Sequence, residues 1–315
     1  MKKTLLALSV FAAATSAQAF ELYNQDGVTV GMGGDIEVVY MNALTDDVNT
    51  PKNDETDFQQ DIQDADINFD VRYAMNDSVQ FGAFFQIEDT GQNVGDTYVA
   101  LYTETMGSLK VGKLCTSLDD AGIGSDYQYG ITTFFKGASE GNFCLPEAVR
   151  YDIDTGSFYA TVAMAQDKAS ENKAIGKNSV FLDTRMGYRV ADFDFTVLGG
   201  TTETDAKETE TLLGAEVRYA GVENLNLAAA YYSMDFDKET SNTVALAAEY
   251  QLDVVALAAG YSFSSSDDKT VEDLNTWYVN AGYPLAPNTT AYVEVGRNDV
   301  NDSETGLAIG VKAEF

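Results

Sequence analysis

The stretch GLAIGVKAEF, residues 306–315, alternates between apolar and polar or small side chains up to its last residue. Leu307, Ile309, Val311 and Phe315 fall on one side of an extended chain, because successive side chains of a β-strand point to opposite faces. Strict alternation of this kind is typical of a strand with one apolar face. We therefore expect a β-strand with one apolar face that continues to the aromatic residue Phe315.

The other end of the chain has the features of an export signal. Two lysines precede an apolar run at 5–14, and the small-x-small sequence AQA follows it. The run is too short to span a bilayer. The sequence predicts a signal peptide at 1–19 and a mature chain, residues 20–315, outside the cytoplasm.

The composition disfavours several classes of protein. Nineteen Lys and Arg against 50 Asp and Glu give a formal charge of −31, and such a surface repels nucleic acid and attracts cations. A content of 45% hydrophobic residues argues against a disordered acidic chain. Histidine, the commonest general base and metal ligand, is absent from the sequence. We expect no catalytic residues, no cofactor, no metal and no nucleic-acid partner.

Alternating segments of this type recur along the whole mature chain. They are rich in β-branched and aromatic residues and are bounded by turn residues, which predicts strands. Sixteen such segments are expected, at 28–41, 65–74, 79–88, 97–104, 108–113, 148–154, 157–166, 180–190, 193–202, 211–219, 225–234, 243–252, 254–263, 276–284, 289–297 and 307–315.

The connections between these segments alternate in length. Tight turns such as 191–192 and 252–253 alternate with long, mostly acidic loops such as 42–64 and 114–147. Short turns at one end and long polar loops at the other are typical of an antiparallel β-barrel that crosses a bacterial outer membrane. Within such a barrel we expect alternate side chains to face hydrocarbon outside and salt water inside.

A repeat of aromatic residues supports the barrel. Tyr188, Tyr219, Tyr250, Tyr283 and Phe315 lie at the turn-side ends of alternate strands, about 32 residues apart, and would form an aromatic girdle at one membrane interface. The last strand would pair with the first and leave no free edge. A secreted β-sandwich also alternates, but it hides its apolar face in a shared core and needs no such tier.

Several segments resemble the general, non-specific porins of Gram-negative outer membranes, the sixteen-stranded trimeric type. GSLKVGK (107–113) and SLDDAGIGSDYQYG (117–130) resemble the strand that leads into a porin's third loop and the first half of that loop. AVRYDIDTGSFYATVAMA (148–165) resembles the next hairpin, and VKAEF the terminal strand. The resemblance implies a homotrimeric, water-filled channel in which the third loop, 114–147, folds into the lumen and narrows it. It also implies a lumenal basic residue at Lys113.

Strand parity places several charged side chains inside the barrel. In INFDVRY (67–73) the apolar residues share one side, so Arg72 points inward. The same reasoning places Arg150, Arg185 and Arg189 in the lumen. A lipid-facing Arg at mid-bilayer costs about 2 to 4 kcal/mol, so each could also be a merely tolerated, hydrated wall residue.

Charges of opposite sign are expected to face each other across the lumen. A basic wall opposite an acidic loop sets up a transverse field that filters ions by sign. The hypothesis is a pore constriction formed by Asp119, Asp120 and Asp126 of the loop with Arg72, Lys113, Arg150, Arg185 and Arg189 of the wall.

The two cysteines bracket the same loop. Cys115 and Cys144 lie in an exported chain, where disulfides form readily. We predict a disulfide that pins the two ends of the loop, with two buried thiols as the alternative. The porin resemblance gives no support to either.

The leading hypothesis is an outer-membrane diffusion channel for ions and small hydrophilic solutes, with a preference for cations. Its partners would be two further copies of the chain, outer-membrane lipids and lipopolysaccharide. A solute-specific channel would need an aromatic lining, and the inward aromatic positions are scattered: Phe84, Tyr159, Tyr232, Tyr278 and Tyr292. Sixteen strands and their wide lumen disfavour an adhesin or structural barrel, and the lack of histidine disfavours an outer-membrane enzyme.

Overall fold

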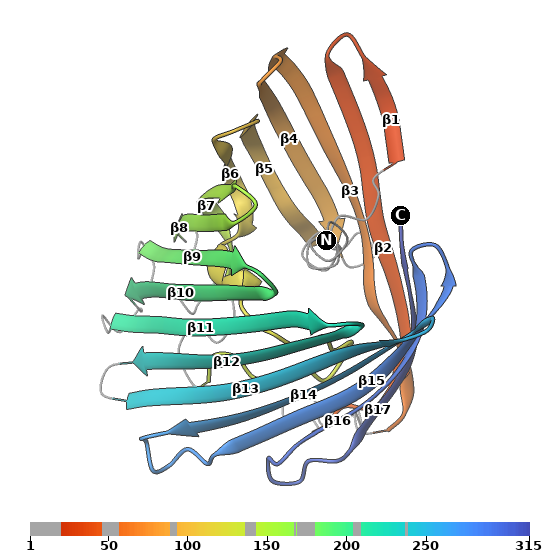
Figure 1. Ribbon diagram of the computed structural model, residues 1–315, viewed down its shortest axis with the longest axis vertical. Coiled ribbons are helices and arrows are strands. Elements are labelled where there is room, and N and C mark those ends of the chain that lie inside the picture. The colour runs from red at the N-terminus through yellow and green to blue at the C-terminus, as the bar shows by residue number, and fades with distance from the viewer. Residues whose placement is uncertain are drawn as a thin grey trace.

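The computed structural model describes residues 20–45, 57–88, 93–135, 143–166, 168, 180–203, 209–236 and 239–315 (Figure 1). The predicted signal peptide at 1–19 lies outside these residues, as do residues 136–142 of the long loop. No helix in the described part of the chain is long and apolar enough to cross a membrane.

The described residues form one antiparallel sheet of seventeen strands and a single 3-10 turn, η2. The elements are β1 (Phe20–Gln25), β2 (Val28–Met41), β3 (Gln59–Asn76), β4 (Val79–Glu88), β5 (Asn93–Thr103), β6 (Gly107–Cys115), η2 (Ser117–Asp120), β7 (Cys144–Asp154), β8 (Phe158–Gln166), β9 (Val180–Val190), β10 (Phe193–Glu203), β11 (Thr209–Val222), β12 (Leu225–Phe236), β13 (Glu239–Leu252), β14 (Val255–Ser266), β15 (Leu274–Ala286), β16 (Thr289–Asn298) and β17 (Gly306–Glu314).

Strands β2 to β17 close into a barrel, as predicted. Each pairs with the next in the chain, and β17 pairs with β2 from Ala308 opposite Met41 to Glu314 opposite Asp35. Closure satisfies the backbone groups of both edge strands, which hydrocarbon could not do. The sixteen-stranded antiparallel barrel is therefore confirmed.

Strand β1 is an element that the sequence did not predict. It forms a hairpin with β2 through Asp26 and Gly27, whose φ angles of 55° and 77° suit an Asp-Gly hairpin turn. Since β3 occupies the full length of the other edge of β2, β1 and β17 lie end to end along one edge. Phe315 exchanges two backbone hydrogen bonds with Gly34, of 2.8 and 2.9 Å, where the two strands meet (Figure 1).

The outer surface of the barrel is apolar at alternate positions. Leu307, Ile309 and Val311 are exposed to the outside, whereas Ala308 between them is fully buried. The same alternation runs through β9 to β16, where the exposed side chains include Leu182, Val197 and others of similar size. This surface suits lipid, because hydrocarbon replaces water around it.

The aromatic residues expected to form a girdle lie on this outer face, close to the short turns. Tyr188, Tyr250 and Tyr283 are 53%, 44% and 51% exposed. Tyr219 is partly covered by Phe193, with 4.6 Å between ring centroids. Rings at this height match the interface between the bilayer and water.

The inner surface differs from the expectation of a uniformly wet wall. A buried apolar cluster covers part of the inner face of β10 to β13 and includes Leu198, Leu212 and Met234. Leu118 and Phe134 of the long loop belong to the same cluster. The loop therefore packs against this part of the wall and excludes water from it, a tertiary contact that strand parity does not reveal.

Candidate functional site

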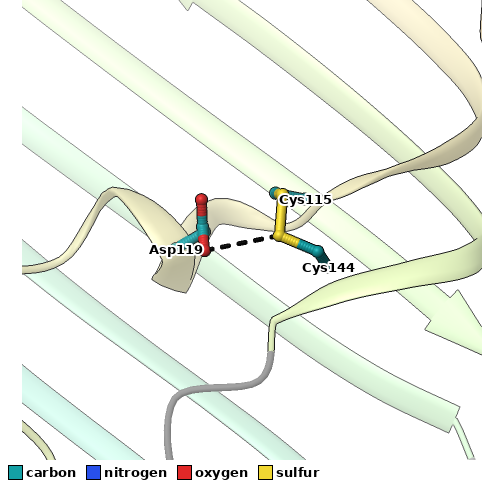
Figure 2. Close-up of side chains that lie close together, drawn as sticks. All are labelled: Cys115, Asp119 and Cys144. Carbon is teal, nitrogen blue, oxygen red and sulfur yellow. Dashed lines mark hydrogen bonds between the residues drawn. A yellow bond between two sulfur atoms is a disulfide. The ribbon is translucent and has the colours of Figure 1, made fainter. Parts of the chain in front are cut away.

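The long loop between β6 and β7 begins and ends at a disulfide. Cys115 and Cys144 are directly opposite each other in the two strands, and their sulfur atoms are bonded (Figure 2). The prediction of this bridge is confirmed. A carboxylate oxygen of Asp119 lies 3.5 Å from Sγ of Cys144, a contact without a proton because an oxidised sulfur has none to donate.

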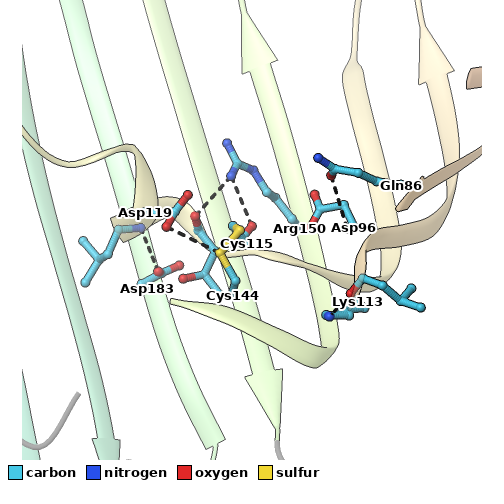
Figure 3. The surroundings of a disulfide bond; sticks show 11 residues. Gln86, Asp96, Lys113, Cys115, Asp119, Cys144, Arg150 and Asp183 are labelled. Atoms are coloured by element: carbon cyan, nitrogen blue, oxygen red, sulfur yellow. Dashed lines mark hydrogen bonds between the residues drawn. A yellow bond between two sulfur atoms is a disulfide. The ribbon is translucent and has the colours of Figure 1, made fainter. Parts of the chain in front are cut away.

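Arg150 of β7 holds the first residues of the loop. Its guanidinium donates to the carbonyl oxygens of Cys115 and Thr116, at 3.2 and 3.1 Å, and Figure 3 shows Arg150 beside Cys115. It also forms an ion pair of 2.6 Å with Asp120. Its Nε also donates to Asp152, at 2.9 Å. Such charge-assisted bonds are stronger than bonds between neutral groups.

Asp183 of β9 binds the start of η2 from the opposite side. Its two carboxylate oxygens accept hydrogen bonds from the backbone N–H groups of Ser117 and Leu118, at 3.2 and 3.0 Å. These N–H groups have no partner within the short 3-10 turn, so the inward-facing carboxylate replaces a capping side chain. The loop is therefore fixed between β7 and β9 immediately after the disulfide.

Further along, glutamates of the wall accept backbone N–H groups of the loop. Glu216 of β11 accepts from Gly122 at 2.8 Å. Glu294 of β16 is fully buried and accepts from Tyr127, Gln128 and Tyr129 at 2.6, 2.8 and 2.7 Å. An extended loop has no internal ladder to satisfy its N–H groups, and these carboxylates supply the acceptors.

The loop then turns back along the same wall. Thr132 donates its N–H to Ser262 of β14 at 3.0 Å, and the ring of Phe134 contacts the edge of Tyr232 of β12, with 5.4 Å between centroids. Across residues 116–135 the loop thus contacts inward-facing side chains of β9 to β16. The inner face of β3 to β7 lies outside most of these contacts.

On the inner face of β3 to β7, cations are paired with acids. Arg72 lies 2.7 Å from Asp70, and its guanidinium lies 4.2 Å from the ring centroid of Tyr102. Lys110 lies 3.2 Å from Asp152. The positive charges of this wall are therefore largely balanced by neighbours on the same wall.

Of the eight residues predicted to form one constriction, the structure brings Asp119, Asp120 and Arg150 together. Arg150 and Asp120 are in direct contact, whereas the prediction placed them on opposite sides of a narrow gap. Asp126 lies at the far end of the loop, next to Gly124 and Gly130.

The other basic residues lie elsewhere. Lys113 follows Gly112, which has a φ of 152° and lies where the register between β6 and β7 is irregular. The ammonium of Lys113 donates a hydrogen bond to the carbonyl oxygen of Val94. Lys113 lies apart from Arg150 (Figure 3). Arg189 pairs with Asp154 near a short turn. Arg72 and Arg185 stand on separate parts of the wall.

The anchors of the loop were not predicted as functional residues. Strand parity also predicts that Glu216, Glu249 and Glu294 face the lumen, but nothing in the sequence shows that the loop binds them. One signal was available: Glu294 lies in AYVEVG between the inward positions Tyr292 and Gly296, a mostly apolar setting in which an isolated acid needs donors.

Burial changes the proton affinity of two loop carboxylates. Partial burial and then the neighbouring charge of Asp120 raise the pKa of Asp119 above its ordinary value, although Arg150 opposes the change. Burial likewise raises the pKa of Asp126. Both groups gain protons at a higher pH than free aspartate does.

Comparison with known proteins gives consistent matches over the whole chain. A model of the Gram-negative porin family matches residues 4–303. The chain is similar to porin-like protein H of Photobacterium profundum, with 28% identity over the full length of both, and to a monosaccharide porin of Halomonas, with 25% identity over 97% of this chain and 84% of that protein. The trimer form of OmpT of Vibrio cholerae superposes with a TM-score of 0.72 at 17% identity, covering 92% of this chain and all of that one.

Proposed function

From the premise that this chain belongs to the Gram-negative porin family of outer-membrane diffusion channels, we propose that it carries ions and small hydrophilic solutes, and cations in preference to anions. The proposal involves no chemical step. The outer apolar surface would contact membrane lipids and lipopolysaccharide.

The observation that carries the cation preference is the charge around the start of the long loop. The wall of β3 to β7 and the adjoining loop residues hold more carboxylates than cations, so the potential there is negative despite the ion pairs. The carboxylates include Asp66, Asp70, Asp96, Asp119, Asp120 and Asp152, and the cations are Arg72, Lys110, Lys113 and Arg150.

We propose that this region is the narrowest part of the channel. The loop occupies the inner side of β9 to β16, which leaves the face of β3 to β7 for permeating solutes. Asp119 would be the loop carboxylate closest to them, because Asp120 is engaged by Arg150. This revises the predicted constriction to a smaller set of residues.

We further propose a homotrimer. The support comes from the similar OmpT barrel, whose trimer form is known. Chemical cross-linking of the protein in mild detergent tests this, and a ladder that ends at the monomer band would contradict it.

Planar-bilayer recording tests the channel itself. Purified protein should give stepwise conductance in KCl, and a KCl gradient should give a reversal potential with the sign of K⁺ permeation. Absence of steps would contradict the channel, whereas a reversal potential of the opposite sign would contradict the cation preference alone. Heat-sensitive mobility on electrophoresis shows that the barrel is folded in each preparation.

One observation favours sugars among the solutes. Phe84 of β4 and Tyr98 of β5 stack on the inner wall, with 5.1 Å between centroids, so Phe84 is less isolated than the sequence indicated. Tyr232, Tyr278 and Tyr292, in contrast, are buried beneath the loop. Aromatic faces suit sugar rings, and one relative is a monosaccharide porin. Liposome swelling with glucose should slow for Phe84→Ala if this pair guides sugars, and an unchanged rate would contradict it.

A further inference from the structure

A cavity of about 280 Å³ lies between the loop and the inner face of β9 to β13. Ile123, Gly124 and Ser125 of the loop border it on one side, and residues close to the short turns, such as Arg189 and Asn226, border it on the other. Its size is just below that of pockets for drug-sized ligands, so it suits a smaller solute.

Three arginines line this cavity, and two of them have acidic partners. Arg189 pairs with Asp154 at 2.9 Å and with Asp194 at 3.4 Å. Arg218 pairs with Glu216 at 2.8 Å and also donates to the carbonyl of Gly122. Their charges are therefore compensated within the protein.

The third arginine, Arg185, differs. Among the described residues it has no ion pair and no hydrogen bond, and its Nε is buried without a partner. The ring of Tyr159 lies beside it, with 5.2 Å between the ring centroid and the guanidinium carbon. A buried polar group without a partner in a native structure calls for a ligand or another compensating group.

The two carboxylates of the cavity are already occupied. Asp194 accepts a hydrogen bond from the hydroxyl of Tyr159 at 2.8 Å. Glu249 accepts from Asn226 at 3.1 Å and from the hydroxyl of Ser125. Neither carboxylate bonds Arg185, so its guanidinium has no acidic partner among the residues that the structure describes around this cavity.

We infer that this cavity is a binding subsite for small organic carboxylates, with Arg185 as the residue that holds the anionic group. A carboxylate matches the planar fork of a guanidinium and can accept two parallel hydrogen bonds. Ala228 and Ala247 line the cavity beside the arginines and suit a short carbon chain better than a bare inorganic ion. Arg185 is the one cation of the cavity lining without an acidic partner among the described residues.

The inference rests on the proposed function only in that solutes reach the lumen. Carboxylates would bind on the short-turn side of the loop, beyond the acidic region that favours cations. The subsite would let an otherwise cation-preferring lumen retain a small anion transiently.

The test uses lactate as the probe and lactamide as its uncharged match. Saturation-transfer NMR on the folded protein in detergent should show lactate binding, and the dissociation constant should rise about tenfold or more for Arg185→Gln, as expected for loss of a hydrogen bond between charged groups. Arg185→Lys keeps the charge without the fork and should lie between the two. Arg297→Gln, on β16 and remote from the cavity, should match the wild type.

Equal binding of lactamide, or unchanged lactate binding in Arg185→Gln, would overturn the inference. Inorganic phosphate that binds as well as lactate would overturn the preference for organic carboxylates. Planar-bilayer recording separates this from the proposed function: a protein that binds lactate but conducts no ions retains the subsite and loses the channel. A protein that conducts ions but does not bind lactate retains the channel and lacks the subsite.

Discussion

Glu294 accepts three backbone N–H groups of residues 127–129, which we call the loop tip. Each of its oxygens serves two donors: Oε1 accepts from the N–H groups of Gln128 and Tyr129, and Oε2 from the N–H of Tyr127 and from Asn280 at 2.9 Å. The substitution Glu294→Gln preserves the shape of the side chain. Whichever oxygen becomes an amide nitrogen, two buried donors lose their acceptor and face another donor.

The cost follows from that count. A buried donor left unsatisfied costs about 1 to 3 kcal/mol, so two of them cost about 2 to 6 kcal/mol. The loop tip can avoid this cost by leaving the wall, whereas the barrel strands keep their own ladders. We therefore expect the tip to detach while the barrel stays folded.

Single-channel recording in KCl measures this directly. Glu294→Gln should change the step size and increase the current noise, because a released tip moves within the lumen. Glu223→Gln, an exposed acid in the turn after β11, is the matched control and should behave as the wild type. Steps and noise identical to the wild type in a folded Glu294→Gln protein would refute the reasoning.

The remaining predictions concern the start of the loop. Replacing Cys115 and Cys144 by Ser should lower the free energy of unfolding by about 3 to 4 kcal/mol, since a bridge over ~30 residues restricts the unfolded chain. Denaturant titration measures this, and an unchanged free energy of unfolding would contradict the expectation. The conductance should stay unchanged because Arg150 still holds the loop. The double change Asp119→Asn with Asp120→Asn should reduce the reversal potential in a KCl gradient, with Asp253→Asn, an exposed acid in the turn after β13, as the control. An equal loss in the control would show that the effect is not local. Cation preference should weaken as the pH falls, and it should begin to do so above the ordinary carboxyl pKa, because the pKa of Asp119 is raised. A cation preference that is unchanged down to the ordinary carboxyl pKa would count against a role for Asp119. Asp119 binds its proton at a higher pH in the folded than in the unfolded chain, so its contribution to stability decreases as the pH rises through that range.

Strand positions were predictable because the alternation of apolar and polar residues lies within each strand's own sequence. The segments 79–88 and 180–190 alternate along their whole length, and β4 and β9 have those bounds. The segment that forms β1 reads FELYNQ, whose six residues are all exposed and show no apolar face. Only the Asp-Gly pair after it indicated a hairpin.

The path of the loop was not predictable in the same way. It depends on acceptors such as Asp183, Glu216 and Glu294, which lie far apart in the sequence and meet the loop only after the barrel has closed. Parity gives the side of a strand that a residue faces, but not what lies opposite. Lys113 shows a second limit: the porin resemblance implied a lumenal basic residue there, and its ammonium donates to the carbonyl of Val94 beside an irregular register at Gly112.

The shared edge of β2 bears on how the barrel is completed. One of its halves pairs with the neighbouring hairpin strand β1, a contact that is local in the sequence, whereas the other stays unpaired until β17 adds to it. Until then a row of amide and carbonyl groups would meet hydrocarbon, at several kcal/mol for each group left unpaired. A chain without β17 would leave that edge of β2 unpaired, which disfavours its insertion into the bilayer.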